Sequence, residues 1–208
     1  MNVFFGDSLT SGENNKFTGY VEKLNIDNCV NNGVSGTCIG DYSLYPVGET
    51  NLIQKIFKNK ADIKKADKIF LEYGCNDISA WCAGYTTFNH IQIDLIKSLD
   101  CLKQINEKAD IYFILLGSND VKFSEGQTGY LTNDYLKNAD VKIDQQTWLN
   151  NYRKFVEFVV KTVPHTLCLP HLLEEDIDVD GMHPNDKGYE KIAHELKGQI
   201  KWDNVEMC

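Results

Sequence analysis

The sequence has no apolar run that approaches the roughly 20 residues a helix needs to cross a bilayer. Near its start it also lacks a basic stretch followed by an apolar one, which is the pattern of a secretory leader. These absences predict a protein without a membrane span and with a cytoplasmic location, unless a leader ahead of Met1 has been removed. Internal repeats and low-complexity tracts are absent too.

The chain is also poor in positive charge, with 21 Lys and Arg against 30 Asp and Glu and a net charge of −9. Such a charge repels polyphosphates, so nucleic acid is not an expected partner. Hydrophobic residues make up 42% and charged residues 25% of the chain, which is ordinary globular usage. A chain of 208 residues buries one core well and is short for two, so we expect a single domain over residues 1–208.

The seven cysteines contain no C-x-x-C pair, and their number is odd. This pattern predicts neither a disulfide framework nor a zinc site. We expect the cysteines to serve as small apolar residues that stay reduced in a cytosol.

Short apolar runs alternate with longer segments of helical periodicity. Strands are predicted at residues 3–5, 29–31, 68–73, 111–116 and 166–169. Helices are predicted at residues 17–24 and 51–59, over the apolar stripes at 91–105 and 149–163, and from residue 184 to residue 200. This alternation predicts parallel strands with right-handed crossovers, hence a three-layer α/β/α sandwich. In such folds ligands bind beyond the carboxyl ends of the strands.

Polar residues and glycines stand directly after the first three predicted strands. Ser8 follows the first strand in "GDS", and a serine hydroxyl becomes a nucleophile when a base takes its proton. Gly33 and Gly36 follow the second strand and allow backbone N–H groups to approach a ligand closely. Asn76 follows the third strand in "GCND" and can direct an amide N–H at a developing oxyanion.

Asp180 and His183 lie just before the last predicted helix, in "DVDGMHPND". Their spacing lets the carboxylate hold Nδ1 of the imidazole while Nε2 faces outward. Each of these residues alone is typical of an ordinary turn or helix cap. Together, in order and at consecutive strand ends, they supply a nucleophile, oxyanion donors, a base and an acid that orients the base.

The stretches "FFGDSLTSG", "NNGVSGT", "LEYGCND" and "DGMHPNDKGYEKIA" together resemble the SGNH hydrolases, also called GDSL esterases and lipases. By position, the resemblance implies a nucleophile at Ser8, oxyanion donors at the Ser8 N–H, the Gly36 N–H and the Asn76 side chain, an orienting acid at Asp180 and a base at His183. Gly33 stays open as the alternative to Gly36, because both follow the second strand.

The resemblance further implies a flavodoxin-like, five-stranded parallel sheet and hydrolysis of acyl esters through an acyl-serine, without a metal or cofactor. Trp81, Tyr85 and Phe88 follow the oxyanion asparagine and are candidates to stack on a sugar or to line an acyl pocket. No long apolar lid suited to lipid interfaces is visible. This favours a small acyl group, acetyl above all, on a small-molecule or carbohydrate alcohol, ahead of thioesterase or lysophospholipase activity.

Other interpretations remain open. A flavin-binding electron carrier would use hydroxyls such as Thr10 to cradle a phosphate, but would make no use of Asn76 or His183. A calcium loop is suggested by residues 176–181, although Lys187 stands where the bidentate glutamate belongs. An inactive relative that serves as a binding module is a third possibility.

A second match to the GxND pattern occurs in "GSND", at residues 117–120. Because Asn119 follows the fourth strand instead of the third, we interpret it as a decoy. The long segment 117–146 carries no predicted element and is a candidate wall or lid of the site.

Overall fold

The computed structural model describes residues 1–13, 18–43, 51–115, 145–170, 172–179 and 183–200. Its centre is one five-stranded sheet in the order β2-β1-β3-β4-β5, with every neighbouring pair parallel. The strands are β1 (Asn2–Gly6), β2 (Cys29–Gly33), β3 (Lys68–Glu72), β4 (Asp110–Leu115) and β5 (His165–Cys168). This is the strand order of the flavodoxin-like folds, and its switch point lies between β1 and β3.

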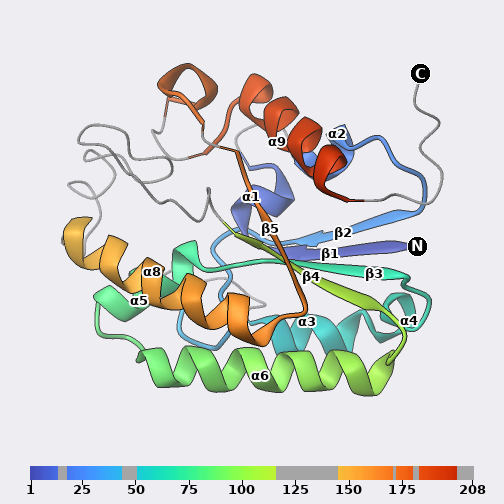
Figure 1. The fold of residues 1–208 in the computed structure, drawn as a ribbon, viewed down its shortest axis with the longest axis horizontal. Helices are drawn as coiled ribbons and strands as arrows, with labels where there is room; N and C mark the ends of the chain where they lie inside the picture. The colour runs from blue at the N-terminus through green and yellow to red at the C-terminus, as the bar shows by residue number, and fades with distance from the viewer. Residues whose placement is uncertain (14–17, 44–50, 116–144, 171, 180–182, 201–208) are drawn as a thin grey trace.

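Helices cover both faces of the sheet (Figure 1). On one face lie α1 (Ser8–Ser11), α2 (Tyr20–Lys23) and α9 (Asp186–Gln199). On the other face lie α3 (Leu52–Lys58), α4 (Lys60–Ile63), α5 (Cys75–Cys82), α6 (Phe88–Ile105) and α8 (Gln145–Thr162). The predicted three-layer α/β/α sandwich is therefore confirmed. A short 3-10 helix, η1 (Glu174–Asp176), precedes α9.

A row of stacked rings runs across four strands of the sheet. Phe4 stacks on Phe70 at 4.4 Å between ring centroids, and Phe70 stacks on Tyr112 at 5.1 Å. Tyr112 in turn stacks on His165 at 4.8 Å. Each pair consists of direct partners in the strand register. Cross-strand ring contacts of this kind stabilise one register over a slipped one.

The predicted strands match the observed ones to within one or two residues, and the three long helices were predicted from their apolar stripes. Three short helices were not predicted: α1, α4 and α5. They have four to eight residues, too few for an apolar periodicity to stand out.

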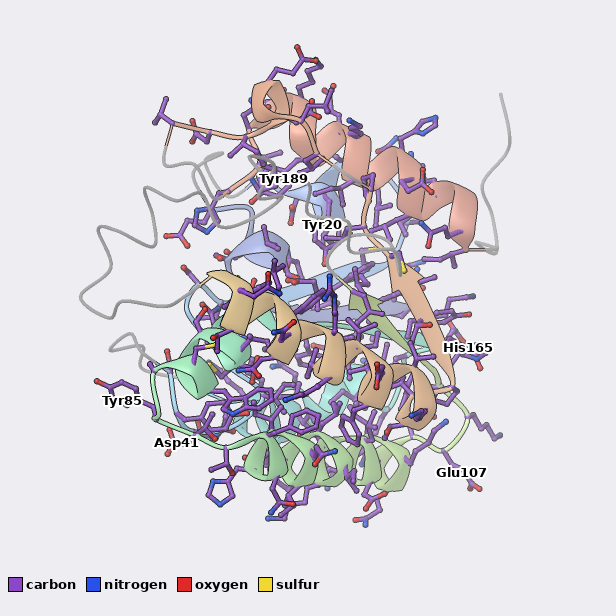
Figure 2. The ribbon with its side chains drawn as sticks, turned by 60° about the vertical axis from the view of Figure 1, so that its left-hand side comes forward. Tyr20, Asp41, Tyr85, Glu107, His165 and Tyr189 are labelled. Atoms are coloured by element: carbon purple, nitrogen blue, oxygen red, sulfur yellow. The ribbon has the colours of Figure 1, made fainter. Side chains whose placement is uncertain are left out.

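The last helix packs against the beginning of the chain. Lys23 forms an ion pair with Asp186 at 2.6 Å, and the Tyr189 hydroxyl donates to the Glu13 carbonyl at 3.3 Å. Tyr20 and Tyr189 are both buried and lie between α9 and the sheet (Figure 2). The segment that leads into α9 is thereby held on the same side of the sheet as α1.

Within the described ranges, no helix combines the length and the apolar character that crossing a membrane requires. The six cysteines in those ranges are free thiols, and Cys208 lies outside them.

Candidate active site

The turn after β1 places Ser8 at the first position of α1. Asp7 caps this helix, because its Oδ1 accepts a hydrogen bond from the Leu9 N–H at 3.0 Å. Gly6 is required just before the cap, since a Cβ there would lie 2.0 Å from Thr10 Oγ1 and 2.9 Å from the Glu72 carbonyl oxygen. The Ser8 side chain therefore follows a tightly packed turn at the carboxyl end of the strand.

The loop after β2 contains the two candidate glycines in different surroundings. At Gly33 a Cβ would meet the Ser11 nitrogen at 2.4 Å, so this glycine lets β2 pack closely against α1. Gly36 has a φ of 72°, in the left-handed region that favours glycine. The chain therefore turns at Gly36, whereas Gly33 serves close packing.

Asn76 joins the first three loops of the site. It lies at the second position of α5, directly after β3, where Gly74 adopts a φ of 131°. Its Nδ2 donates to Asp7 Oδ2 at 3.1 Å and to the Thr37 carbonyl at 3.2 Å. The structure thus gathers the loops that carry Ser8, Gly36 and Asn76 at the carboxyl ends of three neighbouring strands.

A buried lysine lies beneath the same loops. Lys55 is 1% exposed, and its ammonium donates to the Gly6 carbonyl at 2.9 Å and to Thr37 Oγ1 at 2.9 Å. It also lies 3.4 Å from the Tyr73 hydroxyl and 5.6 Å from the centroid of that ring. A cation from α3 therefore contacts the turns that follow β1, β2 and β3.

His183 is buried and held by a short antiparallel contact between residues 176–178 and 183–185. Its carbonyl accepts from the Asp178 N–H at 2.8 Å, and the Asn185 N–H donates to the Asp176 carbonyl at 2.9 Å. The Asn185 side chain then caps α9 by accepting from the Gly188 N–H at 3.1 Å. Asp180 lies outside the described residues, so its predicted contact with His183 stays a prediction.

The imidazole of His183 interacts electrostatically with the Asp7 carboxyl. Burial raises the pKa of Asp7, while the Leu9 N–H, the neighbouring Glu72, His183 and Lys55 each lower it. His183 therefore lies within electrostatic range of the residue that precedes Ser8. A residue near the carboxyl end of the chain therefore lies near the turn that follows β1.

The aromatic candidates are arranged differently from one another. Trp81 and Phe88 stack at 4.9 Å between centroids, and Phe88 makes an edge contact with Phe158 of α8. The Lys154 ammonium lies 5.7 Å from the centre of the Trp81 ring. Tyr85 is 64% exposed and points away from the body of the protein (Figure 2). The structure therefore brings Trp81 and Phe88 together and leaves Tyr85 in solvent.

The calcium interpretation finds no support at Asp176. Its buried carboxylate accepts from the Leu173 N–H at 2.9 Å and from Lys191 at 2.9 Å. In the part of the chain that the structure describes, no group of three or more His, Cys, Asp or Glu side chains could hold a metal ion. Asn119 and nearly all of the candidate lid at 117–146 fall outside that part.

Sequence reasoning assigned no role to four ionisable residues that the structure buries: Asp7, Lys55, Glu72 and Asp77. Two of them, Glu72 and Lys55, could have been recognised as buried from the sequence. Glu72 interrupts the apolar strand "KIFLEY", and the strands of a parallel sheet are normally apolar throughout. Lys55 lies three residues after Leu52, on the buried stripe of its helix.

Strand order and helix placement define a three-layer α/β/α sandwich with a flavodoxin-like parallel sheet. Comparison with protein families makes the class specific, because the model described as the GDSL-like Lipase/Acylhydrolase family matches residues 4–191. The chain therefore belongs to this family, and the resemblance noted from its motifs is confirmed.

Solved structures show the same fold. A family two carbohydrate esterase from Clostridium thermocellum, in complex with cellohexaose, has a TM-score of 0.62 at 15% identity, over 96% of this chain and 63% of that one. The M. smegmatis aryl esterase has a TM-score of 0.60 at 12% identity, over 95% of this chain and 96% of that one. An acetyl xylan esterase from Butyrivibrio proteoclasticus has a TM-score of 0.55 at 17% identity, over 95% of this chain and 62% of that one. At these identities the likeness concerns the fold alone. A search of curated proteins finds no match.

Proposed function

We propose that this hydrolase is a serine esterase that removes small acyl groups, acetyl above all, from small-molecule or carbohydrate esters. The observation that carries the proposal is the Asn76 amide, which ties the Ser8 turn to the Gly36 loop through Asp7 and Thr37. A serine, a positive-φ glycine and an asparagine amide in one place are the parts that acyl transfer requires.

In the proposed reaction His183 takes the proton of the Ser8 hydroxyl, and Ser8 attacks the ester carbonyl. Asp180 would orient the imidazole and stabilise the imidazolium that forms. The alkoxide leaves as an alcohol after it receives this proton from His183. Water, activated by the same imidazole, then releases the acid from the acyl-serine.

The oxyanion of the tetrahedral intermediate would rest on the Ser8 N–H, the Gly36 N–H and the Asn76 amide. Gly36 is the better candidate of the two glycines, because Gly33 is occupied with close packing against α1. Both N–H groups of the Asn76 amide are directed at Asp7 and Thr37, so the oxyanion would share one of these hydrogen bonds. Such donors cost little reorganisation, because they are already held in place.

Support for an acetylated carbohydrate comes from two solved structures of similar fold that are carbohydrate esterases by name, one of them an acetyl xylan esterase. Trp81 lies on the helix that carries Asn76, and Phe88 begins the next helix; the stacked pair would supply a flat apolar surface for a sugar or an acyl group. Thioesterase or lysophospholipase activity is the competing outcome, and the choice of acyl chain distinguishes them.

The decisive experiment is labelling with a fluorophosphonate, followed by peptide mapping. We expect the label on Ser8, and we expect Ser8→Ala to abolish both labelling and hydrolysis of p-nitrophenyl acetate while the circular dichroism spectrum is unchanged. Ser11→Ala is the matched control: this serine lies on the same helix and donates to the Ser8 carbonyl at 3.1 Å, yet its loss should leave labelling intact. A label elsewhere, or an active Ser8→Ala variant, would refute the proposal.

Acyl preference is measured on the same enzyme with p-nitrophenyl esters of increasing length. We expect the acetate to be cleaved faster than long-chain esters. Faster cleavage of the long chains, or of an acyl thioester, would move the assignment to the competing activities.

A further inference from the structure

Glu72 is a completely buried acid at the last position of β3. It is the register partner of Gly6, the residue before Asp7. One carboxyl oxygen, Oε2, accepts from Thr10 Oγ1 at 3.0 Å, and that hydroxyl is also 2.8 Å from the Tyr20 hydroxyl. The proposed reaction makes no use of Glu72, although it lies directly beneath the turn that carries Ser8.

The other carboxyl oxygen of Glu72 is buried and receives no hydrogen bond from a donor that the described side chains or backbone supply. Its neighbour is the carboxyl group of Asp7, which is itself 1% exposed and whose side chain interacts with that of Glu72. Two carboxylates in contact in a buried site cannot both be charged at modest cost. One proton shared between them removes the repulsion and supplies the missing hydrogen bond.

The surroundings decide which carboxyl keeps that proton. Asp7 accepts from the Leu9 N–H and from the Asn76 amide, and the charge of Lys55 favours its ionised form. The main influences on Glu72 include no cation, and it receives one hydrogen bond, from the Thr10 hydroxyl. Burial and the charge of Asp7 both raise the pKa of Glu72 well above its ordinary value. The proton therefore belongs on Glu72.

We propose that Glu72 is a positioning residue, a neutral carboxylic acid that donates its proton in a hydrogen bond to Asp7 and so fixes the carboxylate that caps α1 and holds Asn76. Glu72 acts through Asp7 on the Ser8 turn and on the oxyanion asparagine. The protonation state of Glu72 is a property of the fold, whereas its effect on turnover rests on the proposed esterase function.

Loss of the Glu72 proton would place a second negative charge against Asp7 and loosen its hold on Asn76. Turnover should then fall on the alkaline side. The ionisable groups that interact with this carboxyl pair are Tyr20 on α2, Cys38 after β2, Lys55 on α3, Tyr73 after β3, Cys75 and Asp77 on α5, and His183 before α9. Burial raises the pKa of the two tyrosines and of the two thiols, which keeps them neutral in the relevant range.

The first test is independent of catalysis. The infrared difference spectrum of the wild-type protein against Glu72→Gln at neutral pH should show the carbonyl stretching band of a protonated carboxylic acid in the wild type. The same comparison with Glu22→Gln, at an exposed glutamate, should show no such band. Absence of the band in the Glu72 comparison would overturn the proposal, whatever the protein hydrolyses.

The second test uses the pH profile of p-nitrophenyl acetate hydrolysis. Glu72→Gln keeps a neutral hydrogen-bond donor, so it should retain wild-type kcat at neutral pH. It should also lose the fall in kcat at alkaline pH that ionisation of Glu72 causes in the wild type. Glu72→Leu has no donor and should lower kcat about tenfold or more at every pH, with a smaller change in KM. A Gln variant as impaired as the Leu variant, or an unmoved alkaline limb, would contradict the positioning role. If the Leu variant does not fold, the infrared band and the Gln profile still decide.

Discussion

At the scale of the residue, Asn76 has two tasks that one amide must reconcile. It is a structural link, because Nδ2 bridges the Asp7 carboxylate and the Thr37 carbonyl. It is also the proposed donor to an oxyanion. Preorganisation explains why these tasks are compatible, since an amide already fixed in place loses little entropy when a transition state forms.

We expect Asn76→Ala to lower kcat for p-nitrophenyl acetate by about 10²–10³, which is the usual cost of removing one oxyanion donor. Asn31→Ala is the matched control. The Asn31 amide also donates to a backbone carbonyl, that of Thr10 in α1, at 2.9 Å, but Asn31 lies outside the proposed oxyanion hole. Its loss should lower the melting temperature and leave turnover close to that of the wild type. Equal kinetic damage in both variants would mean that Asn76 is structural only.

At the scale of the element, α3 contributes to the site although none of its residues was a candidate. The Lys55 side chain extends from this helix to the carboxyl end of β1, where its ammonium donates to the Gly6 carbonyl and the Thr37 hydroxyl. Burying an ammonium costs several kcal/mol unless hydrogen bonds and opposite charge compensate it, and here the Asp7 carboxylate supplies the charge. The helix is thereby coupled to two loops of the candidate site.

Lys55→Met should lower the unfolding free energy by about 3 kcal/mol, because it removes charge-assisted hydrogen bonds and leaves the Asp7 charge uncompensated. Urea denaturation followed by circular dichroism measures this. Lys58→Met on the same helix is the control: Lys58 is exposed, and its replacement should change stability by no more than about 0.5 kcal/mol. Similar losses in the two variants would show that Lys55 is not a buried support of the loops.

Short helices mark the limit of what could be predicted at this scale. The stripes at Ile91, Leu95 and Leu102 predicted α6, because an 18-residue helix repeats its apolar period several times. By contrast, α1 has four residues, and its existence depends on the Asp7 cap and on the contact with β2 that Gly33 permits. Helix propensity and apolar periodicity are properties of the local sequence and carry no information about such long-range contacts.

At the scale of the whole molecule, the buried carboxyl of Asp77 couples folding to pH. Asp77 is completely buried on α5, and its Oδ1 accepts from the Ile39 N–H at 2.9 Å and from the Tyr42 hydroxyl at 2.9 Å. Burial, partly offset by these hydrogen bonds, raises the pKa of Asp77 from 3.8 to about 7. Between pH 3.8 and about 7, Asp77 therefore keeps its proton in the folded protein and has released it in the unfolded chain.

The stabilising contribution of the Asp77 proton is complete below pH 3.8 and is lost as pH rises to about 7. We expect the unfolding free energy of the wild type, relative to Asp77→Asn, to decline across this window by at most about 4 kcal/mol and to level off above it. Urea titrations at a series of pH values provide the measurement. Asp110 is exposed, so the unfolding free energy of Asp110→Asn should vary with pH as that of the wild type does. Parallel curves for Asp77→Asn would contradict the prediction.

The sequence by itself determined the sandwich and the family. The alternation of apolar strands with amphipathic helices dictates a parallel sheet, and the order of four short motifs places Ser8 and Asn76 after the first and third strands and His183 before the last helix. These features depend on periodicity and on order along the chain, which are local and need no knowledge of distant contacts.

Only the tertiary structure decided what lies beneath those motifs. It showed that Asn76 contacts Asp7, that Lys55 reaches two loops, and that Glu72 is buried against Asp7. A charged residue in a sequence reads as exposed by default, because burial of a charge is costly. Whether that cost is compensated depends on partners tens of residues away, and the folded chain alone brings these partners into contact.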